Sequence, residues 1–338
     1  MYIAVTGEAN KLSKLSRIGY QPKHEAEVIE INDVVVVKTD FDDVFPFNQF
    51  KDYTDQYNNQ FVEIPSMFIK LDVNDKLQII GRSVHDSFVE GSFKTRAFRI
   101  SKYQGSKKDG KVASIPNKDV LTNITIGNYR ELCRANGSGY QQFDWMARFI
   151  IQTLMTIEFA DTNIQNIFEG PTDNDWKVGT GLTDKIDYHT GYELETKSFK
   201  WRGIENIFGN VWQMVDGIQN QHGIIKATND PDNYSNSGEG YIEVGNFSHE
   251  PSGFISKHSK TVLDGLCLPS EFAANGITHY ADYAWMFHLD RETTYFVHGG
   301  GWDYASSAGL WAWSSRWYGT NASSSVGGRL LQYIPIEG

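Results

Sequence analysis

Residues 298–333 read HGGGWDYASSAGLWAWSSRWYGTNASSSVGGRLLQY and place four of the nine tryptophans of the chain among glycines and small polar residues. Tryptophan and tyrosine give a large contact area at low entropic cost, while serine, glycine and asparagine supply adaptable hydrogen bonds. This composition is typical of a surface that binds a partner. The alternative is a tryptophan-rich core, because tryptophan is highly buried on average.

If residues 311–318 form a strand, alternation separates their side chains onto two faces. The two large aromatic side chains at positions 311 and 313 then point in the same direction, as the contacts of a binding surface would. One face carries Trp311, Trp313 and Ser315, and the other carries Ser314, Arg316 and Tyr318.

The composition of the chain disfavours several classes of protein. Its 338 residues are 40% hydrophobic and 14% aromatic, which favours one or two folded domains over disorder. A net charge of −11 and an isoelectric point near 5.3 disfavour binding to nucleic acid, which requires clustered lysine and arginine. No apolar run reaches the roughly 18 residues of a membrane span, and the amino terminus shows no secretory signal. We therefore expect synthesis in the cytoplasm and no membrane insertion.

The first 57 residues differ in pattern from the rest of the chain. Residues 34–37 are four valines, which predict a strand, and a polar stretch at 53–60 resembles a connector. So short a segment cannot bury both faces of a strand, so this strand should pair with the main domain or with another subunit. We predict that residues 1–57 form an accessory segment for attachment or oligomerisation, and that residues 58–338 form the ligand-binding domain.

Apolar periodicity predicts two helices, at about 125–134 and 142–159. Further short strands are predicted at 76–80, 97–103 and 112–115. Beyond Asp161 the chain shows no long helical pattern, and short strands alternate with loops rich in glycine, asparagine, aspartate and serine. Early helices followed by a loop-rich half predict an α+β fold with short antiparallel strands and long loops.

Several motifs occur in a characteristic order. They are residues 61–70, the helix pair near 126–159, RGIENIFGNVWQMVDG at 202–217, and the ending from GGGW at 299–302 to VGGR at 326–329. In this order they resemble the formylglycine-generating-enzyme-like branch of the C-type lectin fold. Within that branch the chain is similar to the variable proteins of diversity-generating retroelements, a family that includes tropism determinants of bacteriophages. The resemblance covers roughly residues 58–338.

The resemblance implies a binding protein whose region at about 299–329 is diversified and displays ligand contacts on a rigid scaffold. The same branch contains oxidases, which use a pair of redox-active cysteines late in the domain. No cysteine follows Cys267 in this chain, so we expect no oxidase and no other enzyme. We also expect no cofactor and no metal, because the acidic runs at 173–175 and 230–233 lack a full set of calcium ligands.

Three motif residues have physical roles that do not depend on a family. Asn210 follows Gly209, which tolerates a positive φ, and an asparagine in a turn can bond its own backbone, so the next strand can enter a buried layer. Arg329 is predicted to pair with a buried carboxylate or with carbonyls as part of the scaffold. His298, beside three glycines, is interpreted as a structural histidine, with a ligand contact as the alternative.

We predict a preformed aromatic surface that binds a protein or surface receptor, on a virion or on a cell surface after assembly. Aromatic side chains would supply most of the affinity, and neighbouring polar side chains would set selectivity. A glycan is another possible ligand, since sugars stack on tryptophan, although no calcium-dependent sugar motif is present. The predicted ligand-binding residues are Asp303, Tyr304, Ser306, Trp311, Trp313, Ser315, Arg316, Trp317, Tyr318 and Asn321.

The competing hypothesis is a structural virion or cell-surface component whose aromatic patch is a subunit interface, because exposed apolar patches also mark oligomer contacts. The binding hypothesis predicts that Trp311 and Trp313 are more exposed than Trp145 and Trp212. It also predicts that substitutions in the aromatic surface change stability by no more than about 0.5 kcal/mol.

Overall fold

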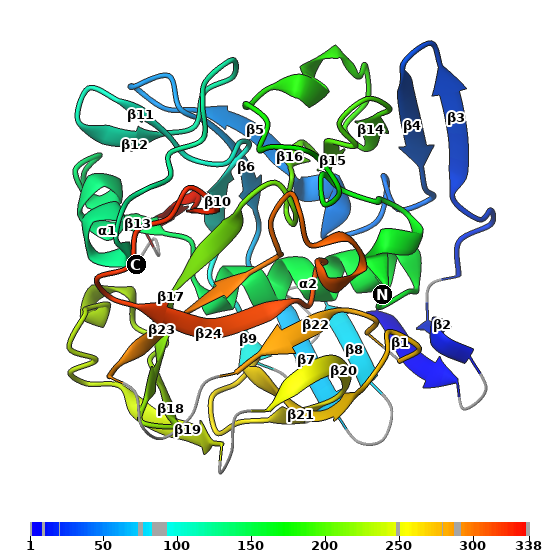
Figure 1. The fold of residues 1–338 in the computed structure, drawn as a ribbon. Coiled ribbons are helices and arrows are strands. Elements are labelled where there is room, and N and C mark those ends of the chain that lie inside the picture. Colours follow the sequence, from blue (N-terminus) through cyan, green and yellow to red (C-terminus); the bar gives the residue numbers. More distant parts are fainter. Residues whose placement is uncertain are drawn as a thin grey trace.

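The computed structural model describes residues 2–8, 11–19, 21–73, 77–82, 93–247, 251–278, 280–286 and 292–335. This part of the chain holds two α-helices, α1 (Ile126–Arg134) and α2 (Trp145–Phe159), and otherwise consists mostly of strands and loops (Figure 1). The fold is therefore α+β, as predicted. None of the described helices is long and apolar enough to cross a membrane.

Both helices begin at a side-chain cap. The Thr125 hydroxyl accepts a hydrogen bond from the backbone N–H of Asn128 at 3.3 Å, and the Asp144 carboxylate accepts one from Ala147 at 2.8 Å. The second helix starts three residues later than predicted, because residues 140–142 pair as a strand before the cap. The two helix predictions are otherwise confirmed.

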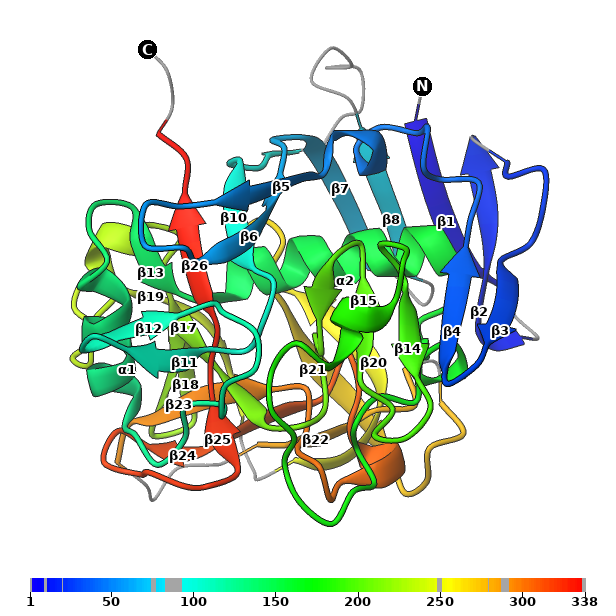
Figure 2. The same cartoon turned by 90° about the horizontal axis from the view of Figure 1, so that it is seen from above.

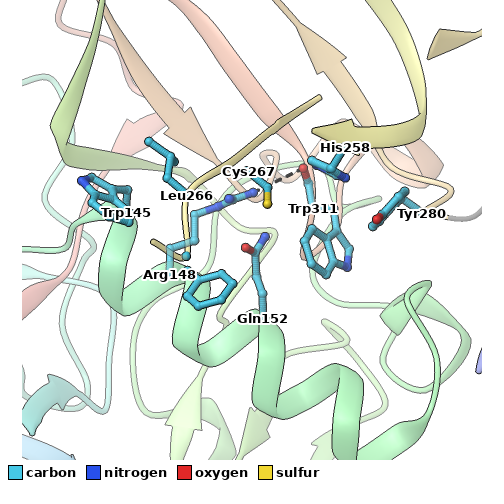
Figure 3. A pocket seen from close by; sticks show the side chains of 10 residues that line it. Trp145, Arg148, Gln152, His258, Leu266, Cys267, Tyr280 and Trp311 are labelled. Atoms are coloured by element: carbon cyan, nitrogen blue, oxygen red, sulfur yellow. Dashed lines mark hydrogen bonds between the residues drawn. The ribbon is translucent and has the colours of Figure 1, made fainter. Parts of the chain in front are cut away.

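Helix α2 runs through the middle of the molecule (Figures 1 and 2), where it contacts strands of two different sheets. Every residue of α2 except Met146 is buried. Most of these residues are apolar, as expected for a helix in the interior of a large domain, although α2 also buries Arg148, Gln152 and Glu158 (Figure 3 shows the first two). The main hydrophobic core forms around it and includes four of the tryptophans, Trp145, Trp201, Trp311 and Trp313.

In the described part of the chain, the strands form four sheets and one separate hairpin. The first sheet has the order β2 (Lys11–Gly19), β1 (Tyr2–Glu8), β8 (Leu77–Arg82), β7 (Phe68–Val73) and β9 (Phe93–Lys94). The second has the order β13 (Tyr140–Gln142), β26 (Leu330–Tyr333), β10 (Phe98–Ser101), β6 (Gln60–Ile64) and β5 (Lys51–Thr54). The hairpin joins β11 (Ser106–Lys108) and β12 (Lys111–Ala113).

The third sheet has the order β16 (Ile204–Glu205), β15 (Phe199–Trp201), β14 (Gly191–Glu193), β4 (Val34–Lys38) and β3 (Glu27–Ile31). The largest sheet has the order β19 (Ile242–Asn246), β18 (Ile224–Ala227), β17 (Trp212–Gln221), β23 (Thr294–His298), β24 (Trp313–Tyr318), β22 (Tyr283–Trp285), β20 (Ser252–Lys260) and β21 (Cys267–Ala273). Strand β25 (Val326–Gly327) pairs with β17 in parallel. Short 3-10 turns lie at Phe47–Gln49, Ile164–Asn166, Leu182–Lys185, Pro231–Asn233 and Ala305–Ser307, and the last of them is η5.

The predicted strands correspond to observed ones. Residues 34–37 lie in β4, and the predictions at 97–103 and 112–115 overlap β10 and β12. The prediction at 76–80 overlaps β8, although Lys76 lies outside the described residues. After Asp161 the described residues contain no α-helix, as predicted.

Strands from the first 57 residues pair with later parts of the chain. Strand β4 pairs with β14, with Val36 opposite Gly191, while β1 pairs with β8 and β5 with β6. Phe41 and Phe47 belong to the main core. The valine strand was expected to pair either with the main domain or with another subunit. In the structure it pairs with the main domain. A separate role of residues 1–57 in attachment stays a prediction.

Asn210, in the turn that begins at Gly209, and Arg329 link distant segments of the scaffold. Gly209 and Asn210 both have positive φ, at 74° and 62°, so the predicted turn is present. The Asn210 amide does not bond its own backbone: it accepts from the N–H of Val178 at 2.7 Å and donates to the carbonyl of the same residue at 3.1 Å. Arg329 is buried and donates to backbone carbonyls of residues 101, 102, 205 and 206, which confirms its scaffold role.

Candidate ligand-binding site

A β-bulge in β24 decides which side chains of the C-terminal segment reach the surface. Tyr295 of β23 lies opposite Trp317, whereas Val297 lies opposite Ser314. Two residues of β24 therefore face one residue of β23, which is the definition of a bulge. The extra residue reverses the alternation, so Trp317 comes onto the same face as Ser314 and opposite to that of Trp313.

The prediction that Trp311 and Trp313 are exposed is wrong. Their exposed fractions are 5% and 0%, compared with 2% for Trp145 and 1% for Trp212. The two rings point in the same direction, as predicted, but this direction is the core around α2. Ser315 is fully buried as well. The tryptophan-rich core that was the alternative interpretation thus applies to this half of the segment.

Dense packing explains why this face of the strand is buried. The ring of Trp313 meets that of Phe296 edge to face at 5.1 Å, and the guanidinium of Arg148 lies 3.6 Å from the centre of its ring. Trp311 packs against Tyr280, with ring centres 4.9 Å apart. An incoming partner cannot reach either ring unless the core opens.

The other face of the segment borders a hollow of about 220 Å³. Four predicted site residues line it: Tyr304, Arg316, Trp317 and Asn321. Three residues that were not predicted complete the lining, namely Trp212, Trp285 and Ser314. The largest sheet therefore brings together residues from β17, β22, β24 and the turn around η5, which are far apart in sequence, and the bulge places Trp317 on the same face.

Three aromatic side chains form the walls of the hollow. The rings of Trp212, Trp285 and Tyr304 lie 5.1–5.5 Å from one another and meet at angles of 78–88°. Edge-to-face contacts of this kind are favourable and fix ring orientation. Trp212 is buried beneath the other two, which are partly exposed. The three rings thus support one another without a ligand.

Local turns hold the remaining lining residues. The Oδ1 atom of Asn321 accepts a hydrogen bond from the N–H of Tyr318 at 2.7 Å, which closes the turn after β24. Tyr304 follows the turn at Gly300, whose φ is 80° and where an added Cβ atom would lie 2.4 Å from the Cβ of Ala308. Arg316 is exposed, and its Nη2 lies 3.4 Å from Ser252 Oγ.

The other predicted residues lie outside the lining of the hollow. Asp303 and Ser306 are exposed, and Tyr318 is partly exposed. Asp303 forms an isolated bridge with Asp173, so the loop that contains Asp173 lies beside the C-terminal segment. These three residues can contact a partner that covers more than the hollow itself.

That neighbouring loop carries an exposed tryptophan that sequence reasoning missed. Trp176 is 55% exposed, and its ring lies 4.8 Å from that of Trp302. The loop is tied to the C-terminal segment by hydrogen bonds from the N–H of Asn174 to the carbonyl of Trp302 at 2.7 Å and from Ala305 to Thr172 at 2.8 Å. The sequence signal was a single tryptophan in a polar run, which is weak alone.

Both cysteines lie in surroundings that disfavour a thiolate. Burial raises the pKa of the Cys267 thiol to about 12 and that of Cys133 well above its usual range, so neither supplies a thiolate at neutral pH. Among the described residues, histidine, cysteine, aspartate and glutamate form no group of three or more that could hold a metal ion. His298 is buried against Phe143, which fits the structural interpretation.

Comparisons with known proteins show distant similarity only. No family model and no curated protein matches the chain. Three solved structures are partly similar. PvdO from Pseudomonas aeruginosa is 12% identical, with 84% of this chain and 98% of that chain covered and a TM-score of 0.35. The Major Tropism Determinant I1 variant is 10% identical over 84% and 81% of the two chains, with a TM-score of 0.32. The Major Tropism Determinant U1 variant is 9% identical, with 97% of this chain and 82% of that chain covered and a TM-score of 0.31. Similarity at this level carries no argument about function.

Proposed function

We propose that this chain is a non-enzymatic binding protein with a C-type-lectin-like scaffold, and that its ligand contacts surround the hollow beside β24. The observation that carries the proposal is this hollow of about 220 Å³ with perpendicular aromatic walls. Binding sites combine apolar and aromatic walls with a few polar groups that fix orientation. Arg316 and Asn321 supply such groups here.

Preorganisation is the physical advantage of this arrangement. Tyr304 and Trp285 are held by contacts with each other and with Trp212, so binding orders few additional side chains. Exposed aromatic and arginine side chains are also the residues most often found as energetic hot spots of interfaces. Trp317 lines the same hollow, and Trp176 adds a further exposed aromatic side chain on the neighbouring loop.

The partner in this proposal is a protein or another surface receptor, and the chain acts on a virion or on a cell surface. The proposed ligand contacts are the exposed or partly exposed members of the predicted set together with two additional tryptophans. They are Asp303, Tyr304, Ser306, Arg316, Trp317, Tyr318, Asn321, Trp176 and Trp285. Diversification of these displayed positions within residues 299–329 would then alter the ligand without altering the core.

Sequencing of the coding region in its natural population tests this proposal. We expect substitutions at codons 303, 304, 306, 316, 317, 318 and 321, and constancy at 311, 313 and 315, because only the first group can change without loss of packing. The matched comparison lies within one segment, so differences in mutation rate along the gene do not matter. Equal variation at both groups, or no excess over the rest of the gene, would contradict the proposal and favour the structural component.

A further inference from the structure

The loop that follows β21 carries an asparagine directly before a glycine. Asn275 is exposed, and the neighbouring Ile277 is 71% exposed, so water reaches this loop freely. The Oδ1 atom of Asn275 accepts a hydrogen bond from the N–H of Ile277 at 3.2 Å. Such an Asx turn brings the side-chain carbonyl back over the peptide unit that follows, which here is that of Gly276.

The groups that react in an asparagine–glycine pair are not engaged elsewhere. Among the described residues, neither the N–H of Gly276 nor the Nδ2 of Asn275 has a hydrogen-bond partner. Glycine also has no side chain to keep its nitrogen away from a neighbouring carbonyl carbon. The hydrogen bond from Ile277 draws electron density from the side-chain carbonyl, which makes Cγ of Asn275 more electrophilic.

The second asparagine–glycine pair of the chain has the same preceding alanine but different surroundings. Asn136 is 2% exposed, and its Nδ2 donates to the carbonyls of Val112 at 2.9 Å and Cys133 at 3.1 Å. The N–H of Gly137 donates to the carbonyl of Arg134 at 2.9 Å. At this pair the side-chain amide and the backbone nitrogen are both held in other contacts, so the fold separates two nearly identical local sequences.

We propose that Asn275 is a site of spontaneous deamidation through a cyclic imide, and that the fold protects Asn136 from the same reaction. The Gly276 nitrogen loses its proton to solvent and bonds to Cγ of Asn275. The bond from Cγ to Nδ2 then breaks, and Nδ2 leaves as ammonia after taking up a proton from solvent.

Water then opens the imide ring at one of its two carbonyl carbons. Cleavage at Cγ restores the normal backbone and leaves aspartate at position 275. Cleavage at the backbone carbonyl carbon leaves isoaspartate, in which the chain runs through Cβ. The net reaction consumes one water and releases one ammonia.

Either product changes the structure around the loop. Both add a negative charge at neutral pH, and isoaspartate also adds an atom to the backbone beside Gly276. Gly276 lies close to Phe254, since an added Cβ would be 3.2 Å from Cε1 of that ring. The Phe254 ring meets that of Tyr283 at 5.1 Å, and Tyr283 lies 4.4 Å from Trp285, a wall of the hollow. A packed row of rings thus connects the loop to the hollow, and only an effect on binding rests on the proposed function.

Peptide mapping by mass spectrometry, after storage of the folded full chain in mildly alkaline buffer, tests the proposal. The peptide with Asn275 should gain the mass difference between an amide and an acid and separate into an aspartate and an isoaspartate form. Its conversion should be at least about tenfold faster than that at Asn136, because a buried site reacts only through rarely populated openings. In concentrated urea both should convert at similar rates.

Asn275→Gln is the control variant, since glutamine would have to close a larger ring and the exposed position should leave the fold intact. Its peptide should keep the amide mass in the folded chain. An Asn275 that stays unchanged in the folded chain while both asparagines convert in urea would overturn the proposal. Equal conversion of Asn136 and Asn275 in the folded chain, or aspartate without isoaspartate, would contradict it as well.

Discussion

Replacement of Trp313 by alanine is expected to lower the free energy of unfolding by about 3–5 kcal/mol, the range for emptying a large aromatic core site. Trp313 is fully buried between Phe296 and the guanidinium of Arg148. The substitution leaves a cavity and also removes the ring that lies against a buried charge. Equilibrium denaturation in urea measures the loss.

The matched control is alanine at an exposed tryptophan of the same surface region. Trp176→Ala should lower the free energy of unfolding by no more than about 1 kcal/mol, because more than half of the side chain is already in water. Comparable losses in the two variants would mean that the division into a buried and a displayed aromatic layer is incorrect.

The second large effect is expected at Glu158, near the end of α2. Its carboxylate accepts hydrogen bonds from Trp201 Nε1 at 2.7 Å, from Arg202 at 2.8 and 2.9 Å, and from the hydroxyl of Thr39 at 2.6 Å. Glu158→Ala should lower the free energy of unfolding by about 3–5 kcal/mol, because a buried Arg202 would lose its main partner. Asp42 lies 3.1 Å from Arg202 and remains as a second partner, so we expect a loss near the lower end of this range.

Glu271 provides the control for this substitution. It pairs with Lys257 at 3.3 Å on the surface, where its side chain is 63% exposed. Glu271→Ala should change the free energy of unfolding by no more than about 1 kcal/mol, as is usual for exposed ion pairs. A loss at Glu158 as small as that at Glu271 would show that the network beneath β15 does not stabilise the fold.

Local patterns predicted the helices and the turn at Gly209 well. Thr125 and Asp144 are recognisable as helix caps, and apolar residues at helical spacing follow each of them. The α+β class follows from the same patterns. These features depend on neighbours along the chain, which is the information that a single sequence contains.

The error at Trp311 and Trp313 has a different origin. Alternation tells which side chains share a face, but it does not tell which face meets the core, and it fails at a bulge. Two buried residues, Ser314 and Ser315, precede the exposed Arg316, and neither serine reveals its burial in the sequence. The orientation is decided by α2, which is distant in sequence and supplies Arg148 beneath Trp313.

The same reasoning explains why part of the site was missed. Trp212 and Trp285 join Tyr304 only because β17, β22 and β24 belong to one sheet. Trp176 joins the surface through backbone hydrogen bonds between its loop and residues 302–305. Such contacts between distant segments are set by topology, for which a single sequence carries little signal.

Hydroxyl-radical footprinting of the intact chain, read by mass spectrometry, tests the central claim that the C-terminal aromatic segment has a displayed face above a buried one. We expect oxidation at Trp176, Tyr304 and Trp317, and protection of Trp311 and Trp313 to the level of Trp212. No substitution is needed, so a failure to fold cannot confuse the result. Oxidation of Trp311 and Trp313 at rates close to that of Trp176 would contradict the account.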